Sequence, residues 1–467
     1  MGTPTERGVF SEESALTRQL SLFDSVMIVV GMVIGSGIFL TTGGIARSLP
    51  HPGWILAVWA AGGLVCLAGA LTFAELGAMM PTAGGQYVFL REAFGKLPAF
   101  LFGWACLMVI YSGSVAAVSA GFAEYLGYFF PSLPKVASSV ASVLLLTWLN
   151  ARGVRESARL QNVFSAAKIV AILGLGLVGT VVVQQKGLSL GAGGIAAPGS
   201  AGIPPLSHLG VALIAVLWAF DGWSCITFAA GEVKNPRRNL PLSLLIGTLL
   251  VSGLYVLVNY VYVAVIPIAR LTDTVRVAEV TTTSLLGPRG AVVLVLVVLA
   301  STFSSMNAMI LTGPRAYFAM ARDGVFLPAL AKVSPTRGTP AAAIWAQGIW
   351  SVLLALSGKY DQLFTFAMSA AMAFYVATGA AVYVLRAKYP GAHRPYRVWG
   401  YPVTPLVYIA GTGLALVNGL VDRPWESLAG FGLVATGIPV YLYWRKRRPA
   451  ETPERCENLE PDPAPSE

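Results

Sequence analysis

Two of the membrane-length apolar segments in this chain carry a helix-breaking cluster near their middle. The clusters span residues 31–39 in the first segment and 218–224 in the sixth. An unwound stretch in hydrocarbon leaves peptide N–H and C=O groups unpaired, so it persists only where protein or a ligand satisfies them. Two such breaks, five spans apart, predict a binding site near the bilayer midplane.

The composition is that of an integral membrane protein. Hydrophobic residues make up 55% of the 467 and charged residues only 12%, whereas a soluble chain would have roughly a quarter of its residues charged. Because about 20 apolar residues cross a bilayer, we predict an all-α protein with about 12 transmembrane helices. The predicted spans are roughly 20–46, 53–80, 97–127, 135–151, 158–183, 207–231, 240–267, 280–312, 340–357, 360–386, 401–421 and 428–445.

The distribution of basic residues predicts the orientation. With an even number of spans both termini lie on one face, and Lys and Arg are concentrated on that face. Both termini are therefore predicted to be cytoplasmic, in a plasma (inner) membrane. The net charge of +10 is explained by this loop bias and by the lipid bilayer, and nothing further supports nucleic-acid binding.

The remaining segments predict packing and linkers. Cys66, Cys106 and Cys225 fall in spans and Cys456 in the tail, and a buried thiol is expected to behave as a small hydrophobe. Residues 1–19 are expected to form a cytoplasmic N-terminal segment, with no cleavable signal before the first span. Residues 184–206, rich in Gly, Ala and Pro, predict an extracytoplasmic loop, and residues 446–467 a disordered cytoplasmic tail.

The chemistry of the breaks suggests an amino acid as ligand. The half-helix that restarts near Ile38 would present free N–H groups and a positive dipole end to a carboxylate. Carbonyls freed around Val33 and Ile34, and others at the sixth-span break, would accept hydrogen bonds from an ammonium. The alternative is a helix-packing face from Gly31 to Gly35, with Gly37 continuing the close helix contact. The predicted substrate-binding residues are Ile34, Gly35, Ser36, Gly37, Ile38, Trp218, Ala219, Asp221 and Gly222.

Four motifs stand at corresponding places in a known family. They are Gly35-Ser36-Gly37-Ile38-Phe39, Phe220-Asp221-Gly222-Trp223, the segment 232–241 and the segment 394–402. Together they resemble the amino acid-polyamine-organocation superfamily, in particular its L-type amino acid transporter-like branch and the bacterial permeases and exchangers related to it. The resemblance runs from about residue 18 to 445.

The resemblance implies a LeuT-like fold with discontinuous first and sixth spans. Residues 20–183 and 207–386 would form two inverted repeats of five spans, and 387–445 would add the last two. In that family the carboxylate meets the segment that is Ser36 to Ile38 here, and the amino group meets carbonyls near Ile34, Trp218 and Asp221. Trp218 also stands at the position of an aromatic gate, with core packing or a lipid-facing position as the alternatives.

Lys168 lies about ten residues into the fifth span, where a charge is costly unless it faces a partner or a polar cavity. Relatives without sodium dependence carry a lysine here that contacts the unwound part of the first span. The resemblance therefore implies a coupling role for Lys168 as a substitute for sodium. The alternative is a side chain that snorkels to the cytoplasmic surface.

Other polar residues leave two interpretations open. Asp221 could attract the substrate ammonium or exchange protons, or it could cap the second half-helix of the sixth span. Asn307 could line the pocket or make interhelical hydrogen bonds. Glu75 and Glu232, near cytoplasmic ends of spans, are predicted to form ion pairs.

The chain lacks the motifs of a pump or of an enzyme. It contains no GxxxxGK[ST], no HExxH and no GxSxG, and no cofactor or metal is predicted. We expect a secondary transporter of neutral amino acids that works by sodium-independent exchange. The alternatives are proton-coupled symport, transport of cationic amino acids or polyamines, and a sensor that does not transport. The loop 127–134 has no cysteine, so no disulfide-linked glycoprotein subunit is expected, and the protein would be a monomer or a homodimer.

Overall fold

The computed structural model describes residues 15–187, 202–357, 360–422 and 424–447, and over these ranges the protein is helical without a β-strand. Within the same ranges eight helices are long and apolar enough to cross a membrane, or nine if the bent pair α1 and α2 forms one span. The predicted all-α membrane architecture is confirmed. Residues 1–14, most of the loop 184–206, nearly all of the tail 446–467 and Cys456 lie outside the described residues.

The helices of the first half follow the predicted segments closely. They are α1 (Leu22–Val33), α2 (Gly37–Ser48), α3 (Pro52–Met79), α4 (Gln86–Phe94), α5 (Lys96–Ala105), α6 (Tyr111–Leu126), α7 (Lys135–Arg152) and α8 (Val154–Gln185). A short π-helical turn, Cys106–Ile110, joins α5 to α6. Cys66, Cys106 and Cys225 are buried free thiols, as predicted.

The second half has more interruptions. Its helices are α9 (Leu206–Ala219), α10 (Pro236–Val265), α11 (Ile268–Leu271), α12 (Val277–Leu286), α13 (Pro288–Thr312), α14 (Pro314–Arg322), α15 (Ala341–Ser357), α16 (Tyr360–Lys388), α17 (Val403–Asp422), α18 (Pro424–Ala435) and α19 (Gly437–Arg447). Short 3₁₀ helices cover Trp223–Thr227, Ala230–Glu232 and Pro328–Ala331.

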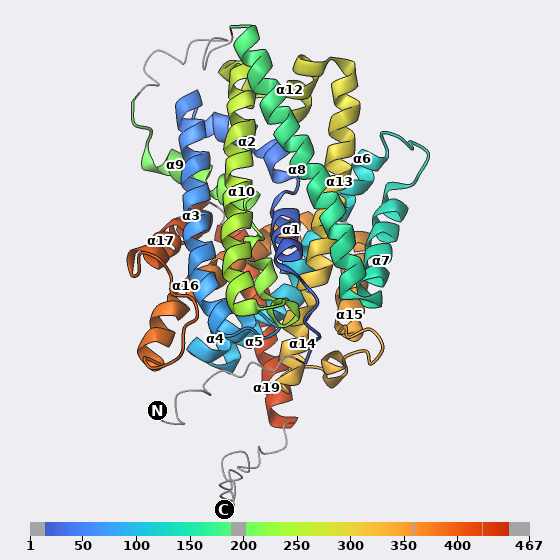
Figure 1. Ribbon diagram of the computed structural model, residues 1–467, viewed down its shortest axis with the longest axis vertical. Helices are drawn as coiled ribbons and strands as arrows, with labels where there is room; N and C mark the ends of the chain where they lie inside the picture. Colours follow the sequence, from blue (N-terminus) through green and yellow to red (C-terminus); the bar gives the residue numbers. More distant parts are fainter. Residues whose placement is uncertain (1–14, 188–201, 358–359, 423, 448–467) are drawn as a thin grey trace, which may run out of the picture.

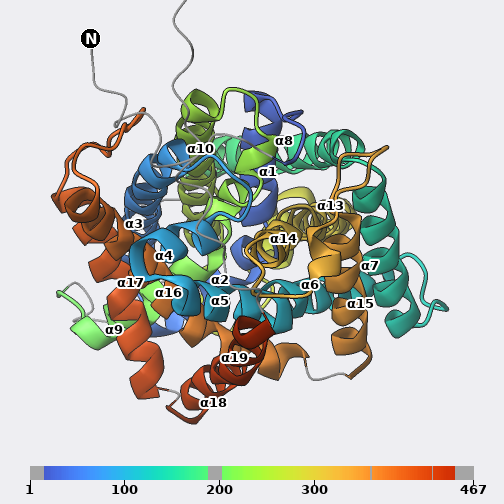
Figure 2. The same cartoon turned by 90° about the horizontal axis from the view of Figure 1, so that it is seen from below.

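The broken helix α1 lies inside the bundle. It packs against α8, α10 and α13, while α2 packs against the end of α9. In Figure 1 α12 lies at the upper end of the molecule and α19 at the lower end. Figure 2, seen from below, shows α7, α17 and α18 on the periphery around this interior. The two elements that carry the breaks are thus held by long helices from both halves of the chain.

Local chemistry explains where the first break begins and ends. Ser21 and Asp24 form a capping box at the start of α1, with Asp24 N donating to Ser21 Oγ at 3.2 Å and Ser21 N to Asp24 Oδ2 at 2.8 Å. The helix ends at Val33, and α2 resumes at Gly37 with a bend of 44°. The predicted discontinuity of the first span is confirmed.

The second break lies where it was predicted, but the chain beyond it does not resume an α-helix. The α-helix α9 ends at Ala219, and Gly222 takes the left-handed conformation with φ of 104°. A side chain could not adopt this φ without strain. Beyond Gly222 the chain forms 3₁₀ turns, so the second half-helix predicted up to residue 231 is wrong.

The predicted eighth span, 280–312, is wrong at its start. Gly287, with φ of 68°, separates α12 from α13, and Pro288 occupies the first turn of α13. Apolar residues continue on both sides of this turn, so hydropathy alone does not register it. In the last predicted span, helix α18 begins at Pro424 and a second helix, α19, follows from Gly437.

A buried ion pair ties the end of the sixth segment to α14. Glu232 and Arg315 are 0% and 1% exposed, and Arg315 donates to both carboxylate oxygens at 2.8 and 2.9 Å. Glu75 on α3 accepts from Arg386 on α16 at 2.9 and 2.6 Å. The ion pairs predicted for both glutamates are confirmed.

Replacing Glu232 with Gln should destabilise the protein markedly, because Arg315 would remain buried without a counter-charge. The expected loss is about 3–5 kcal/mol. The measurement is thermal unfolding of detergent-purified protein. The matched control is Glu124→Gln, which removes a carboxylate from a pair with Lys135 that is 55% and 62% exposed. That variant should lose about 0–1 kcal/mol; equal losses in the two variants would contradict the assignment.

Candidate functional site

The ammonium of Lys168 lies against the break of the first segment. Lys168, on α8, is fully buried, and Nζ donates to the carbonyl oxygens of Gly31 at 2.8 Å and Ile34 at 2.7 Å. The carbonyl of Ser301 lies 3.4 Å away. The side chain therefore reaches inward, and the snorkelling alternative is wrong. Its amino group occupies acceptors that a cation at the break would need.

Two hydroxyl groups from α13 complete this arrangement. Ser301 Oγ donates to the carbonyl of Ile34 at 2.7 Å, and Ser305 Oγ donates to that of Gly31 at 3.0 Å. The resemblance implied that hydroxyls of the eighth span form a sodium site in this fold, but the sequence interpretation named only Asn307 in this stretch and neither serine. The spacing of four residues between the serines, which places both on one helix face, is the signal that could have identified them.

Tyr255 on α10 links the two breaks. Its hydroxyl lies 3.0 Å from the carbonyl of Val33 and 3.2 Å from that of Ala219. With Lys168 and Ser301 on Ile34, the carbonyls expected to receive a substrate ammonium from the first break already have partners within the protein. The predicted role of Ile34 and Ala219 in binding a substrate stays a prediction. A tyrosine within an apolar segment gives no sequence signal for such a role.

The start of α2 keeps its donors available. Within the described residues, the backbone N–H groups of Ser36, Gly37 and Ile38 donate no hydrogen bond to a protein acceptor. The first N–H groups of a helix have no partner in the helix itself and lie at its positive end. The predicted carboxylate-binding segment therefore has the donors that such a ligand requires.

Gly37 brings the two breaks into contact. A Cβ atom at this position would lie 2.9 Å from Ala219 Cα and 3.5 Å from Trp218 Cζ3. At Gly35 the nearest atom would be Ser305 Oγ at 3.6 Å, which is an ordinary contact. The ring of Trp218 thus lies beside the start of α2, and the residue is 36% exposed.

The helix-packing alternative holds for Gly31 and Gly37, which allow close helix contacts, but not for Gly35. A Cβ at Gly31 would collide with the amide of Gln161 on α8, and the Oγ of Ser165 would lie 2.5 Å from it. Gly31 therefore allows close approach of α1 and α8. Gly35, by contrast, lies in the break and has room for a methyl group.

Asp221 does not cap a helix. The residue that precedes the 3₁₀ helix is Gly222, and no side chain caps it. The carboxylate of Asp221 instead accepts from the hydroxyl of Tyr375, on α16, at 2.8 Å. Asp221 keeps part of its surface exposed beside the second break.

Asn307 belongs to an interhelical network. Its amide nitrogen donates to Gln161 Oε1 at 2.8 Å, and its oxygen accepts from Asn150 Nδ2 at 2.9 Å and Ser157 Oγ at 3.1 Å. These bonds connect α7, α8 and α13. Since the side chain is fully buried and occupied at both ends, it supports packing, and we do not assign it to a pocket.

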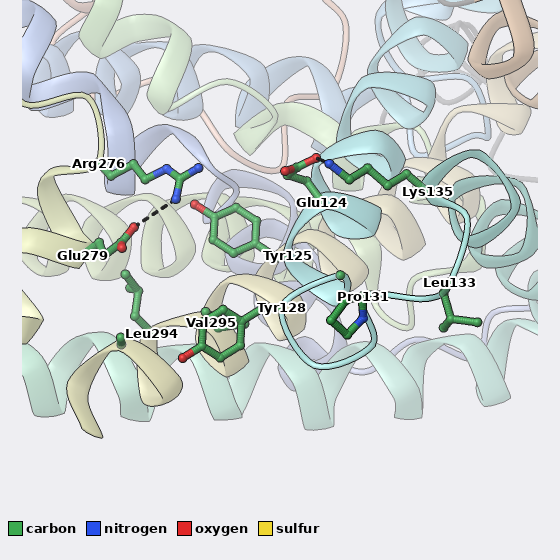
Figure 3. A pocket seen from close by; sticks show the side chains of 12 residues that line it. Glu124, Tyr125, Tyr128, Pro131, Leu133, Lys135, Arg276, Glu279, Leu294 and Val295 are labelled. Atoms are coloured by element: carbon green, nitrogen blue, oxygen red, sulfur yellow. Dashed lines mark hydrogen bonds and ion pairs between the residues drawn. The ribbon is translucent and has the colours of Figure 1, made fainter. Parts of the chain in front are cut away.

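A separate cavity of about 360 Å³ is lined by the end of α6, the following loop, α12 and α13 (Figure 3). Figure 3 shows two ion pairs on its wall, Glu124 with Lys135 at 2.6 Å and Arg276 with Glu279 at 3.4 Å. None of the predicted substrate-binding residues lines it. The cavity is therefore distinct from the candidate site.

Comparison with known proteins gives a family match and several similar transporters. Residues 20–438 match the family described as amino acid permease. The chain is 32% identical to the human b(0,+)-type amino acid transporter 1 over 458 residues, which cover 94% of this chain and 90% of the relative. It is 32% identical to the mouse Asc-type amino acid transporter 1, with 94% and 83% covered. It is 30% identical to the human large neutral amino acids transporter small subunit 2, with 93% and 82% covered.

The region that matches the family contains the candidate site. The family region includes both breaks, Lys168 and nearly all of the described helices. The resemblance predicted from the Gly-Ser-Gly and Asp-Gly-Trp motifs is confirmed. The chain belongs to the amino acid permease family of the amino acid-polyamine-organocation superfamily.

Proposed function

We propose that this protein is a secondary transporter that exchanges neutral amino acids across the membrane without sodium. The proposal rests on one observation, that the donors and the acceptors of the first break have different partners. The N–H groups of Ser36 to Ile38 remain available for a carboxylate, while the ammonium of Lys168 holds the carbonyls on the other side. The names of three relatives, which describe amino acid transporters, support the same substrate class.

The substrate would lie between the two breaks. We propose that its carboxylate meets Ser36, Gly37 and Ile38 and that its amino group meets the backbone at the end of α9, near Trp218 and Asp221. Gly37 lies against Ala219, so one small ligand could reach both segments. Trp218 is partly exposed, and its large apolar ring is suited to cover the bound ligand as a gate.

The absence of sodium coupling is proposed from the position of Lys168. Released carbonyls of the first span and hydroxyls of the eighth are the ligands of a sodium site in this fold, as expected from the resemblance. Here the amino group of Lys168 donates to the carbonyls of Gly31 and Ile34, and the hydroxyls of Ser301 and Ser305 donate to the same two carbonyls. An ammonium at this point would repel sodium and occupy its ligands.

The cellular arrangement is proposed on sequence grounds. The protein would span the plasma membrane with both termini in the cytoplasm, since its basic residues are concentrated on that side. It would work as a monomer or homodimer without a disulfide-linked subunit, because the loop 127–134 contains no cysteine. The division into inverted repeats at 20–183 and 207–386 is part of the same proposal.

Uptake of labelled amino acids into proteoliposomes tests the function. Neutral amino acids should enter faster when the vesicles contain unlabelled amino acid, and initial rates should be equal in sodium and choline media. Lys168→Ala should transport poorly in both media, because two carbonyls lose a charged donor. A large sodium stimulation of the wild-type protein would refute the role of Lys168. Uptake driven by a pH gradient into vesicles without internal amino acid would favour proton symport over exchange.

Gly37→Ala should impair transport more than Gly35→Ala. At position 37 the new methyl group would press on Ala219, and such overpacking typically costs about 1–3 kcal/mol. At position 35 the same methyl group has room. The measurement is initial uptake together with the substrate-induced rise in unfolding temperature. Equal activity of both variants would show that transport does not depend on the contact between Gly37 and Ala219.

A second candidate, transport of cationic amino acids, is favoured by one observation. Asp221 borders the break and is partly exposed as a residue, and its carboxylate accepts a hydrogen bond from the hydroxyl of Tyr375. If it receives a substrate side chain, Asp221→Asn should weaken competition by lysine and arginine about tenfold and spare neutral amino acids, since a charged hydrogen bond is lost. Equal loss for neutral amino acids would place the carboxylate at the common amino group instead.

A further inference from the structure

A cavity of about 590 Å³ lies where the chain enters α1, outside the substrate site. Its walls come from the segment before α1, the first turns of α1 and α8, and the loop that precedes α10. The basic side chains that line it are Arg18, Arg155, Arg159 and Lys234. Asp24 is the acidic residue of the lining. The cavity therefore has a marked excess of positive charge.

The carboxylate of Asp24 is already engaged. Asp24 Oδ2 accepts from the backbone N–H of Ser21 at 2.8 Å and from its hydroxyl at 2.7 Å, and Oδ1 accepts from Asn162 Nδ2 at 2.6 Å. These bonds fix the start of α1 to α8. The carboxylate is thus directed at neutral donors, and it offsets only part of the charge around the cavity.

The cations are brought together by the fold. Arg155 and Arg159 lie one turn apart on α8, where like charges repel. Lys234 is held opposite them because its backbone N–H donates to the carbonyl of Leu20 at 2.8 Å. Leu20 N in turn donates to the carbonyl of Glu232 at 2.9 Å. We call these two hydrogen bonds between Leu20 and the segment 232–234 the latch. The latch and α8 thus present basic side chains to one space.

We propose that this cavity binds a phosphate group, with Arg155, Arg159 and Lys234 as its ligands. A phosphate supplies several acceptor oxygens and negative charge, and guanidinium groups bind it through paired hydrogen bonds. The source is the headgroup of an anionic lipid or a soluble phosphate compound. The lipid source rests on the proposed orientation, which places this face at the anionic cytoplasmic leaflet. A bound anion would connect the latch to α8.

The test is thermal unfolding of the purified full-length protein in detergent, titrated with dioctanoyl phosphatidylglycerol. The anionic lipid should raise the unfolding temperature in a saturable way, because a ligand of the folded state stabilises it. Dioctanoyl phosphatidylcholine, which has no net charge, should have little effect. Inorganic pyrophosphate is the soluble arm: a response to the lipid alone assigns a headgroup, and an equal response to pyrophosphate assigns a soluble ligand.

The double variant Arg155→Gln, Arg159→Gln should bind the effective ligand more weakly by about tenfold or more, since each charged hydrogen bond is worth at least that factor. The matched control is Arg445→Gln, Lys446→Gln on α19, which removes the same charge from exposed positions outside the cavity. If the double variant does not fold, Lys234→Gln is measured in its place. A wild-type response in the cavity variant, or an equal loss in the control, would overturn the proposal. Binding is read without transport, so failure here is distinguishable from failure of the proposed function.

Discussion

The contact between the Lys168 ammonium and the carbonyls of Gly31 and Ile34 is the interaction on which the site depends. A helix that stops inside a membrane protein exposes its last carbonyl groups, and each needs a donor. Lys168 supplies an amino donor from α8 at 2.8 and 2.7 Å, and Ser301 and Ser305 supply hydroxyls from α13. The carbonyls of Gly31 and Ile34 therefore have donors within the protein and need no bound ion to satisfy them.

These hydrogen bonds bear on the polarity of the site. With the carbonyls of Gly31 and Ile34 bonded within the protein, the N–H donors at the start of α2 are the groups that we propose for a substrate carboxylate. The second break contributes from the other side, and Tyr255 bonds to a carbonyl of each break at 3.0 and 3.2 Å. A displacement of one break would therefore alter a hydrogen bond of the other. Such coupling suits the proposed exchanger, in which the substrate would bridge both segments before they move together.

Much of this arrangement could be predicted from sequence. Clustered glycines and Asp221-Gly222 marked both breaks, and Lys168 was conspicuous as a charge deep in an apolar segment. Partners contributed by distant helices could not be predicted, since nothing local distinguishes Tyr255 from a packing aromatic. The start of α13 was misplaced because hydropathy does not register the turn at Gly287. Asn307 could be interpreted correctly only once Gln161 and Asn150 were seen beside it.

The central claim is that Lys168 replaces sodium while the start of α2 receives the carboxylate. A cryo-EM structure of the protein in lipid nanodiscs, with sodium and the amino acid that exchanges fastest, tests both parts together. The account predicts the substrate carboxylate within hydrogen-bond distance of the N–H groups of Ser36 to Ile38, with Lys168 still bound to Gly31 and Ile34. A sodium ion between those carbonyls and the hydroxyls of Ser301 and Ser305, or a carboxylate bound elsewhere, would contradict it.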